Sequence, residues 1–366
     1  MEDQRVFDKK CTAVMKGILI IFMLYHHLFS GDYTAHNVQL VFAPDIFDYP
    51  YFVLFGKTCV GGFAFLSAYG IMKQMMKINK PSGFIRAVLR RLIRLESTVI
   101  FIYTTAMLYI TLVMKVKIST FYLDANGYFH RHWILIDALG LADLFRTPTF
   151  NVTWWYMSAA VLIILVMPFV CLIYRKLRYY TLPVMAVYPY LLMRQDRYAN
   201  HLAVLLAAVF FGSAFAYENW FEKIDDLRRK AVWSQIVYIA VCAALTVFAF
   251  CGSMKHISVD RYYVPAAVVM ASLTMSYFSR IPYLNKVLGF LGKYSGDIFM
   301  VHTLIYFYYY PDFIYSFRYD LLILAVLLAI SLLAALIISG LKKLTRYDRL
   351  TELVLRKLEA GQESGK

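Results

Sequence analysis

The amino-acid sequence predicts an all-α, polytopic membrane protein of about ten transmembrane helices. Three observations lead to this fold class. The chain is 61% hydrophobic over 366 residues, whereas soluble domains are usually about half apolar or less. Apolar stretches of membrane-spanning length recur along it. Lys and Arg side chains gather in short clusters between these stretches, as they do in cytoplasmic loops.

Ten stretches approach the roughly 20 apolar residues that a spanning helix needs. They cover residues 13–30, 51–74, 95–114, 154–174, 180–194, 201–217, 232–251, 262–279, 287–308 and 320–342. The stretch 133–145 is amphipathic and carries two aspartates, so we interpret it as a re-entrant or surface-lying helix. No small-residue cleavage site follows the first apolar stretch, so we expect this helix to be retained rather than removed as a signal peptide.

The distribution of basic residues predicts the topology. With the N-terminus inside, 28 of the 38 Lys and Arg residues fall on the inner side. The positive-inside rule then places both termini in the cytoplasm, which requires an even number of spans. We divide the chain into a membrane domain, residues 1–342, and a cytoplasmic amphipathic tail, residues 343–366. Because inner loops account for the net charge of +15, we expect no nucleic-acid partner.

Ionisable side chains inside the predicted spans are the first candidates for function, because such groups are costly in a bilayer. His27 lies eleven residues after Lys16, a rise of about 16 Å on a helix. Lys16 would then lie near the inner interface and His27 at mid-depth. Adjacent helical residues point about 100° apart, so His26 is assigned to packing or to the substrate side of the site. A core imidazole bonded to a neighbouring helix is the alternative for a lone histidine.

Two further clusters carry charge. Arg91 and Arg94 are spaced i, i+3 and so share a helix face, where two guanidiniums suit phosphate binding. Ordinary anchoring by positive charge explains them equally well. In the ninth predicted span, His302 lies at a depth similar to that of His27, and Asp297 is a second polar group in the same helix.

Aromatic residues mark the outer mouth of the fourth predicted span. Trp154, Trp155 and Tyr156 are either interfacial anchors or a stacking platform for a sugar ring. No GxSxG, Walker, HExxH or cysteine-based metal motif occurs in the sequence, so we expect no metal. The five cysteines are scattered and are interpreted as buried thiols.

These features, in this order, resemble those of the acyltransferase 3 family of integral membrane O-acyltransferases. The resemblance is carried by Lys16 with His27, VGGFAFLSAYGI (60–71), RLIRL (91–95), WWYMS (154–158) and FLGKYSGDIFMVH (290–302). It covers nearly the whole membrane domain. Lys16 stands where the family often has arginine, and Ala68 stands where a glycine usually follows the serine of the second helix. The proline that usually follows the RxxR-Leu element is replaced by Glu96.

The resemblance implies transfer of an acyl group, most often acetyl, from cytoplasmic acyl-CoA to a hydroxyl of a cell-envelope or lipid-linked glycan. His27 would act as general base or transient acyl carrier. The implied supporting roles are phosphate binding by Lys16, Arg91 and Arg94, orientation of the site by His302 and Asp297, and acceptor binding by Trp154, Trp155, Tyr156 and His26.

The sequence-level expectation is therefore a stand-alone O-acetyltransferase of the bacterial plasma membrane. It would use acetyl-CoA as co-substrate and carry no SGNH-type esterase domain. A transporter or flippase for a glycolipid or small anion is the alternative, since it also needs intramembrane His and Arg residues. Against it, no pair of Gly- or Pro-broken helices recurs in matching halves of the chain. Oligomeric state is not predictable from these features.

Overall fold

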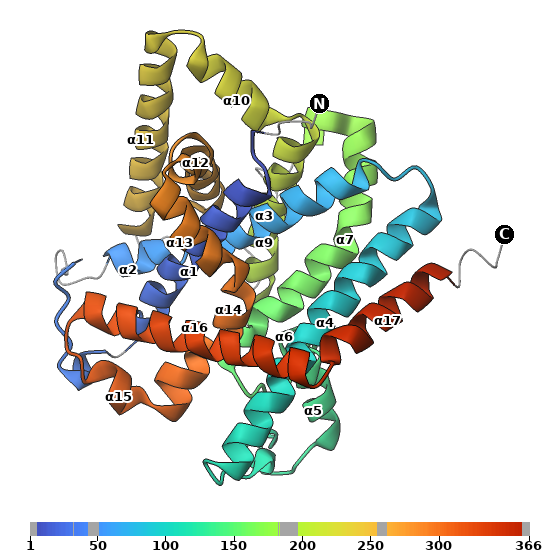
Figure 1. The fold of residues 1–366 in the computed structure, drawn as a ribbon, viewed down its shortest axis with the longest axis vertical. Helices are drawn as coiled ribbons and strands as arrows, with labels where there is room; N and C mark the ends of the chain where they lie inside the picture. The colour runs from blue at the N-terminus through green and yellow to red at the C-terminus, as the bar shows by residue number, and fades with distance from the viewer. Residues whose placement is uncertain are drawn as a thin grey trace. The chain divides into compact units, whose positions relative to one another are not determined.

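The computed structural model confirms the predicted fold class (Figure 1). It describes residues 6–360 except 32, 43–50, 182, 184–196 and 255–261. The protein is 82% helical, and the described residues form only isolated bridges in place of β-strands.

Within the described residues, six helical segments are long and apolar enough to cross a membrane, and each overlaps a predicted span. They are α1 (Lys9–Phe29), α2 with α3 (Tyr51–Gly56 and Cys59–Met75), α4 (Pro81–Leu112), α7 (Trp155–Leu177, preceded by the 3₁₀ turn Val152–Trp154), α11 (Val232–Met254) and α16 (Asp320–Leu344). The total of ten spans and the side on which each terminus lies stay predictions.

The other four predicted spans do not match any of these six long apolar helices. The fifth, 180–194, falls mostly outside the described residues. The sixth corresponds to α9 (Arg197–Tyr217) and the eighth to α12 (Tyr263–Ser276), which has 14 residues. The ninth is broken at Tyr294 into α13 (Pro282–Lys293) and α14 (Ser295–Thr303), and α14 continues as a π-helical turn, Leu304–Tyr309.

The chain divides into two compact units, which are described separately. Unit 1 comprises Met1–Lys77, Met167–Ser295 and Asp312–Leu328, and unit 2 comprises Ile78–Val166, Gly296–Pro311 and Ala329–Lys366. Unit 1 therefore holds α1, α3, α9, α10 (Trp220–Arg229), α11, α12 and α13. It also holds α15 (Pro311–Tyr315), apart from the first residue of that helix. Unit 2 holds α4, most of α14, and the short helices α5 (Arg131–Ala138) and α6 (Ala142–Phe145).

Glycines set the packing of α1 in unit 1. A Cβ atom on Gly17 would overlap the backbone carbonyl of Leu288, and one on Gly292 would overlap that of Ala13. Helices α1 and α13 therefore approach backbone to backbone along this stretch (Figure 1), as small residues allow in membrane proteins. The glycine of the FLGKYS segment thus holds α13 against the turn of α1 that carries Lys16.

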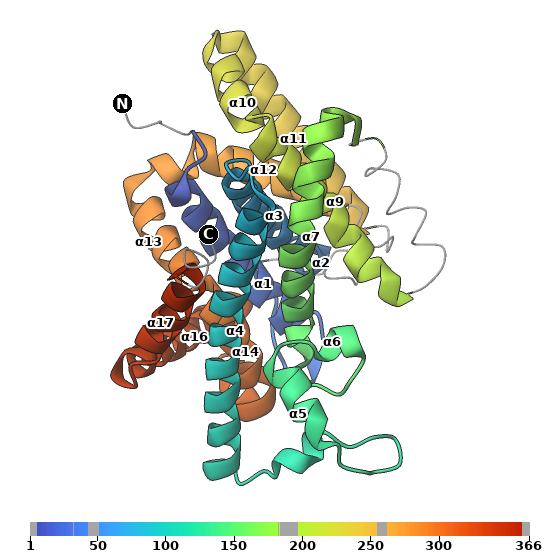
Figure 2. The same cartoon turned by 90° about the vertical axis from the view of Figure 1, so that its right-hand side faces the viewer.

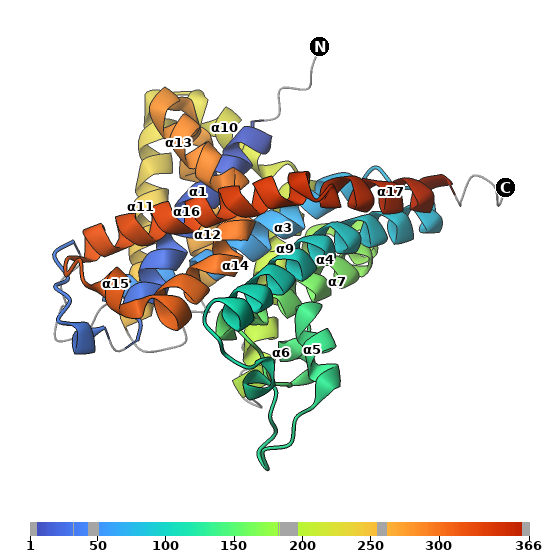
Figure 3. The ribbon, with the colours of Figure 1, turned by 60° about the horizontal axis from the view of Figure 1, so that its bottom comes forward.

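In unit 2 the long helix α4 is joined by the C-terminal helix α17 (Tyr347–Ala360), which lies alongside it (Figure 3). Their contact includes a hydrogen bond of 2.7 Å between the hydroxyls of Ser97 and Thr351. Rings of Phe101 and Tyr347 pack with centroids 4.8 Å apart. Helix α17 thus has a contact face on α4, while the domain boundary at residue 342 and the cytoplasmic position of the tail stay predictions.

Candidate active site

The first candidate residues lie on α1, which runs without a break from Lys16 to His27. The two histidine rings are 5.4 Å apart between centroids and tilted by 56°. Nδ1 of His26 lies 2.9 Å from the carbonyl oxygen of Val53. Because a carbonyl only accepts, Nδ1 of His26 carries a hydrogen and donates it. His26 is therefore bonded to α2, while His27 points to a different side of α1 and is half-buried.

The end of α1 that carries His27 is held by tyrosines. The hydroxyl of Tyr25 donates to the buried carboxylate of Asp320 at 2.8 Å. The hydroxyl of Tyr315 donates to the backbone carbonyl of Leu28, also at 2.8 Å. Both bonds are buried, so the last turn of α1 has a fixed rotation and His27 a fixed direction.

The candidate phosphate-binding arginines lie on α4, where Arg91 is half-buried and Arg94 is exposed. Nη2 of Arg94 lies 3.5 Å from Oε1 of Glu352 on α17, with both side chains more than half exposed. Arg90 forms an ion pair with Glu359 on the same helix. The tail therefore supplies carboxylates to two neighbouring arginines of α4.

His302 is fully buried in unit 2 and begins a chain of hydrogen bonds. Its Nδ1 lies 2.7 Å from the carbonyl oxygen of Phe299, so Nδ1 carries a hydrogen. Its Nε2 lies 3.0 Å from Oγ1 of Thr303, which lies 3.0 Å from Oγ1 of Thr153. Thr153 Oγ1 in turn lies 2.9 Å from Oδ1 of Asn151. The chain joins α14 to the start of α7.

The number of hydrogen atoms available to this chain determines how many of its bonds can form at once. Three bonds link His302 to Asn151 through two hydroxyl groups. A neutral ring with its hydrogen on Nδ1 leaves two hydroxyl hydrogens for the three bonds. With a hydrogen on Nε2 as well, each of the three bonds would have its own hydrogen, and each hydroxyl would donate in the direction of Asn151. The chain therefore ties the His302 ring to Asn151 through two hydroxyl groups.

Asp297 lies on a different side of α14 from His302, because five helical residues turn the direction by about 140°. Its Oδ1 is 3.8 Å from Nζ of Lys342 on α16, and both side chains are mostly buried. Nζ of Lys342 is also 3.5 Å from the hydroxyl of Thr98 on α4. Asp297 therefore joins α14 to α16 through an ion pair.

The three aromatic candidates take different positions at the start of α7. Trp154 is 2% exposed, and its indole N–H donates to the carbonyl of Met300 at 3.0 Å. This bond runs parallel to the His302 chain and ties the same two segments. Trp155 and Tyr156 are half-buried, with nearly perpendicular rings whose centroids are 5.8 Å apart.

A buried carboxylate organises the loop next to these aromatics. Asp137, in α5, is fully buried and accepts hydrogen bonds from the hydroxyls of Tyr122 and Thr149, each at 2.8 Å, and from the N–H of Phe150 at 2.6 Å. Burial raises the pKa of Asp137, although these donors act against the shift. Figure 2 shows α5 and α6 beside the end of α4. Asp137 thus fixes the segment that leads into Asn151.

The loop between α4 and α5 contains one further polar pair. Nε2 of His130 lies 2.9 Å from the Asp124 carboxylate. This histidine, together with the N–H groups of Asn126 and Tyr128, holds the pKa of Asp124 below its usual value. The pair closes the turn 124–130 and is remote in sequence from the other candidates.

Sequence reasoning missed Asn151, Thr153 and Thr303. A threonine in an apolar segment usually bonds its own helix backbone, so sequence alone gives it no weight. The contact between Thr153 and Thr303 joins residues that are 150 positions apart. The Nδ2 group of Asn151 is buried and has no hydrogen-bond partner among the described residues.

The candidate residues are thus distributed over both units. Lys16, His26 and His27 belong to unit 1, whereas the arginines, the aromatic residues, Asp297 and His302 belong to unit 2. Their convergence on one site stays a prediction. Within the described residues, no group of three or more His, Cys, Asp or Glu side chains is placed to hold a metal ion.

An all-α chain with several apolar helices of spanning length defines a multi-pass membrane protein. The model of the acyltransferase domain family matches residues 13–340. The chain therefore belongs to the acyltransferase 3 family and is a membrane acyltransferase. No curated protein and no solved structure matches the chain.

Proposed function

We propose that this acyltransferase moves an acetyl group from cytoplasmic acetyl-CoA to a hydroxyl of a cell-envelope polysaccharide. The observation that carries the proposal is the unbroken α1 helix between Lys16 and His27. It puts a cation and an imidazole about 16 Å apart along one rod. That separation suits a donor that keeps its phosphates near the membrane surface and extends its thioester toward mid-membrane.

At the donor end, Lys16, Arg91 and Arg94 bind the phosphates of CoA. Arg91 and Arg94 lie one turn apart on α4, and paired guanidiniums favour phosphate oxygens. Arg94 is reachable because its ion pair with Glu352 is long and exposed, and such pairs contribute little. A phosphate group displaces Glu352 from Arg94 at small cost.

At the reacting centre, His27 takes the proton of the acceptor hydroxyl as its oxygen attacks the thioester carbonyl. The new C–O bond forms the acetyl ester, the C–S bond breaks, and CoA leaves as a thiolate that is then protonated. The alternative is transfer through an acetylated His27: a ring nitrogen attacks the thioester and releases CoA, and the acceptor hydroxyl then attacks the acetyl group and frees the imidazole. His302 orients the site, and its chain to Asn151 holds the ring in place.

The acceptor enters from the predicted outer side, along the start of α7. Trp155 and Tyr156 present half-buried aromatic rings, which suit contact with sugar rings. Trp154 positions them through its bond to Met300. The unsatisfied Nδ2 of Asn151 supplies a hydrogen-bond donor for a sugar oxygen.

The proposal is tested with purified protein, acetyl-labelled acetyl-CoA and polysaccharides from cell-envelope preparations. We expect label to become attached to polysaccharide and to be released by mild alkali, as an O-acetyl ester is. Label transfer from longer acyl-CoA donors at equal efficiency would contradict the acetyl assignment. Transport of a glycolipid or anion without any covalent labelling would contradict the proposal as a whole.

A further inference from the structure

A second charged centre lies in unit 1, on residues to which no role in acyl transfer is assigned. Asp225 on α10 is buried, and three arginines surround it. Nη2 of Arg228 is 2.6 Å from its carboxylate, Nε of Arg229 is 2.8 Å away, and Nη2 of Arg280 is 3.5 Å away. One carboxylate balances one of these three charges, so the cluster carries an excess of two positive charges.

The Arg228 guanidinium is fixed in place by its surroundings. Its Nη1 donates to Oε1 of Gln235 at 3.2 Å. Its central carbon lies 5.9 Å from the ring centroid of Tyr238 and 6.0 Å from that of Tyr277, within the range of cation–π attraction. Arg228 is thus a fixed cation, whereas the side chains of Arg229 and Arg280 are 55% and 45% exposed beside it.

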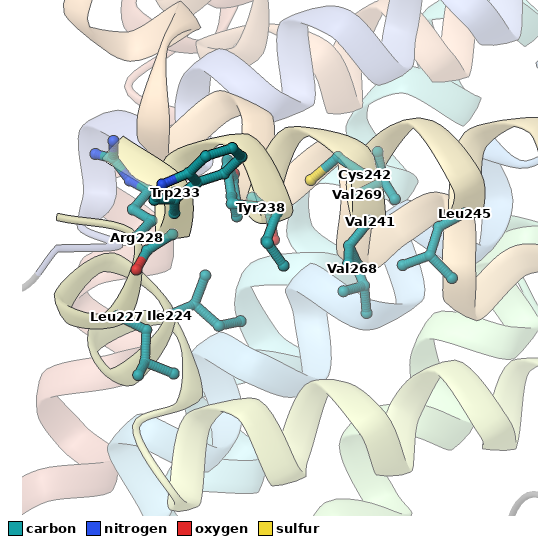
Figure 4. A pocket seen from close by; sticks show the side chains of 13 residues that line it. Ile224, Leu227, Arg228, Trp233, Tyr238, Val241, Cys242, Leu245, Val268 and Val269 are labelled. Carbon is teal, nitrogen blue, oxygen red and sulfur yellow. The ribbon is translucent and has the colours of Figure 1, made fainter. Parts of the chain in front are cut away.

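An apolar groove of about 510 Å³ starts at this cluster and runs between α10, α11 and α12. Figure 4 shows Arg228 and Trp233 at one end of the groove and Leu245 at the other. Val237 and Val241 form part of its wall and are half or more exposed, and Trp233 is 76% exposed. The groove is therefore open along the side of α11, of whose apolar stretch only 17% is buried.

The dimensions of the groove match one leaflet of a bilayer. Its lining on α11 extends from Trp233 to Leu245, which is about 18 Å along a helix. Half of a hydrocarbon core of about 30 Å is similar in depth. The exposed Trp233 lies at the charged end, where interfacial tryptophans occur. The charge count places this end of α11 on the cytoplasmic side, where anionic lipids attract basic residues.

We propose that this groove binds one anionic phospholipid, with its phosphate at Arg228, Arg229 and Arg280 and one acyl chain along α11. The excess charge selects the anionic headgroup, and the apolar walls select a molecule with a hydrocarbon chain. None of its residues is assigned to the donor or the acceptor, and its existence does not depend on the identity of the acyl acceptor.

The test measures lipid retention by purified protein in detergent, using native mass spectrometry with phosphatidylglycerol or phosphatidylcholine of equal chain length. Wild-type protein is expected to retain phosphatidylglycerol in preference to phosphatidylcholine. The variant Arg229→Gln/Arg280→Gln removes the excess charge and leaves the buried Arg228–Asp225 pair intact. Its retention of phosphatidylglycerol should fall by about fivefold or more per arginine, toward the level of phosphatidylcholine.

Two further variants separate the groove from general charge. Val241→Trp fills the exposed wall and should reduce retention while leaving the arginines unchanged. Lys223→Gln/Lys286→Gln removes two other exposed cations of unit 1 and should retain lipid as the wild type does. Equal retention of the two lipids by wild type, or full retention by Val241→Trp, would overturn the proposal. So would displacement of the lipid by glycerol 3-phosphate or by acetyl-CoA, since the groove would then bind a soluble phosphate compound.

Discussion

At the scale of single residues, the most informative side chains are polar groups that are buried inside the protein. His302 and Asp137 are both fully buried, and each is surrounded by donors and acceptors that specify its state. His302 faces a chain of two threonine hydroxyls that ends at Asn151. Asp137 faces two hydroxyls and an N–H that favour its ionised form, against burial that favours the neutral form. The balance at each residue makes a testable prediction.

The chain of hydroxyls next to His302 should contribute to turnover. Thr303→Val keeps the shape of the side chain and removes the oxygen that joins His302 to Thr153. We expect kcat to fall by about tenfold or more, in line with acid–base effects, with little change in KM. Thr246→Val removes a hydroxyl that bonds the backbone carbonyl of Cys242 and should leave kcat unchanged. Equal kcat values for the two variants would show that the chain has no role in turnover.

The stability of the outer loop should depend on pH through Asp137. Its pKa is raised by burial, so the folded loop holds a proton at pH values where the unfolded chain has lost it. The free energy of local opening should therefore rise as pH falls through the folded pKa, and level off below the ordinary carboxyl value of about 3.9. Hydrogen exchange of residues 131–150 measures this dependence, which Asp137→Asn should abolish. A pH profile in Asp137→Asn identical to that of wild type would assign the effect to another group.

At the scale of helices, close backbone contact and paired charges decide which elements join. Gly17 and Gly292 let α1 and α13 touch through their backbones. Carboxylates of α17 meet arginines of α4. The glycine contact between α1 and α13 leaves no room for an added side-chain atom. The ion pairs between α4 and α17 are exposed and can exchange with other charged groups.

Gly17→Ala should destabilise unit 1. Its added methyl group meets the backbone of Leu288, which cannot move aside as a flexible side chain does, and overpacking of this kind costs about 1–3 kcal/mol. Gly340→Ala in α16 is the matched control, because its Cβ would have no neighbour within 4 Å. Thermal unfolding in detergent compares the two variants with wild type. Equal midpoints for Gly17→Ala and Gly340→Ala would contradict the close contact.

The tail should compete with the acyl donor for Arg94. Glu352→Gln removes the carboxylate that lies 3.5 Å from Arg94 and should lower KM for acetyl-CoA by about two- to threefold, as expected for a weak exposed pair. Glu359→Gln frees Arg90, which is assigned no role in binding, and should leave KM unchanged. A KM for Glu352→Gln that equals the wild-type value would remove Arg94 from the proposed phosphate site.

At the scale of the whole molecule, hydropathy and charge predict the class of fold but not its irregularities. The six long apolar helices match six predicted spans, because a continuous apolar run suffices to define them. The helix break at Tyr294 and the π-helical turn after Thr303 have no counterpart in the hydropathy of residues 287–308. Hydropathy therefore predicts a single helix for this stretch. The bond between Thr153 and Thr303 depends on tertiary packing, which one sequence does not reveal.

The same difference between local and tertiary features applies to the candidate catalytic residues. The Lys16–His27 spacing is local to one helix, so the sequence predicts it and α1 preserves it. Asp297 and His302 share a helix, yet Asp297 pairs with Lys342 and His302 bonds toward Thr303. Proximity in sequence therefore predicts the depth of these two residues but not their partners.

The central claim is that His27 carries out acetyl transfer. Its most direct test is the initial rate of label transfer from acetyl-CoA to polysaccharide by purified His27→Ala, compared with wild type and with His132→Ala, which changes an exposed histidine of α5. We predict that kcat of His27→Ala falls by about 10²–10⁴-fold and that His132→Ala keeps the wild-type rate. A wild-type rate in His27→Ala protein would contradict the claim.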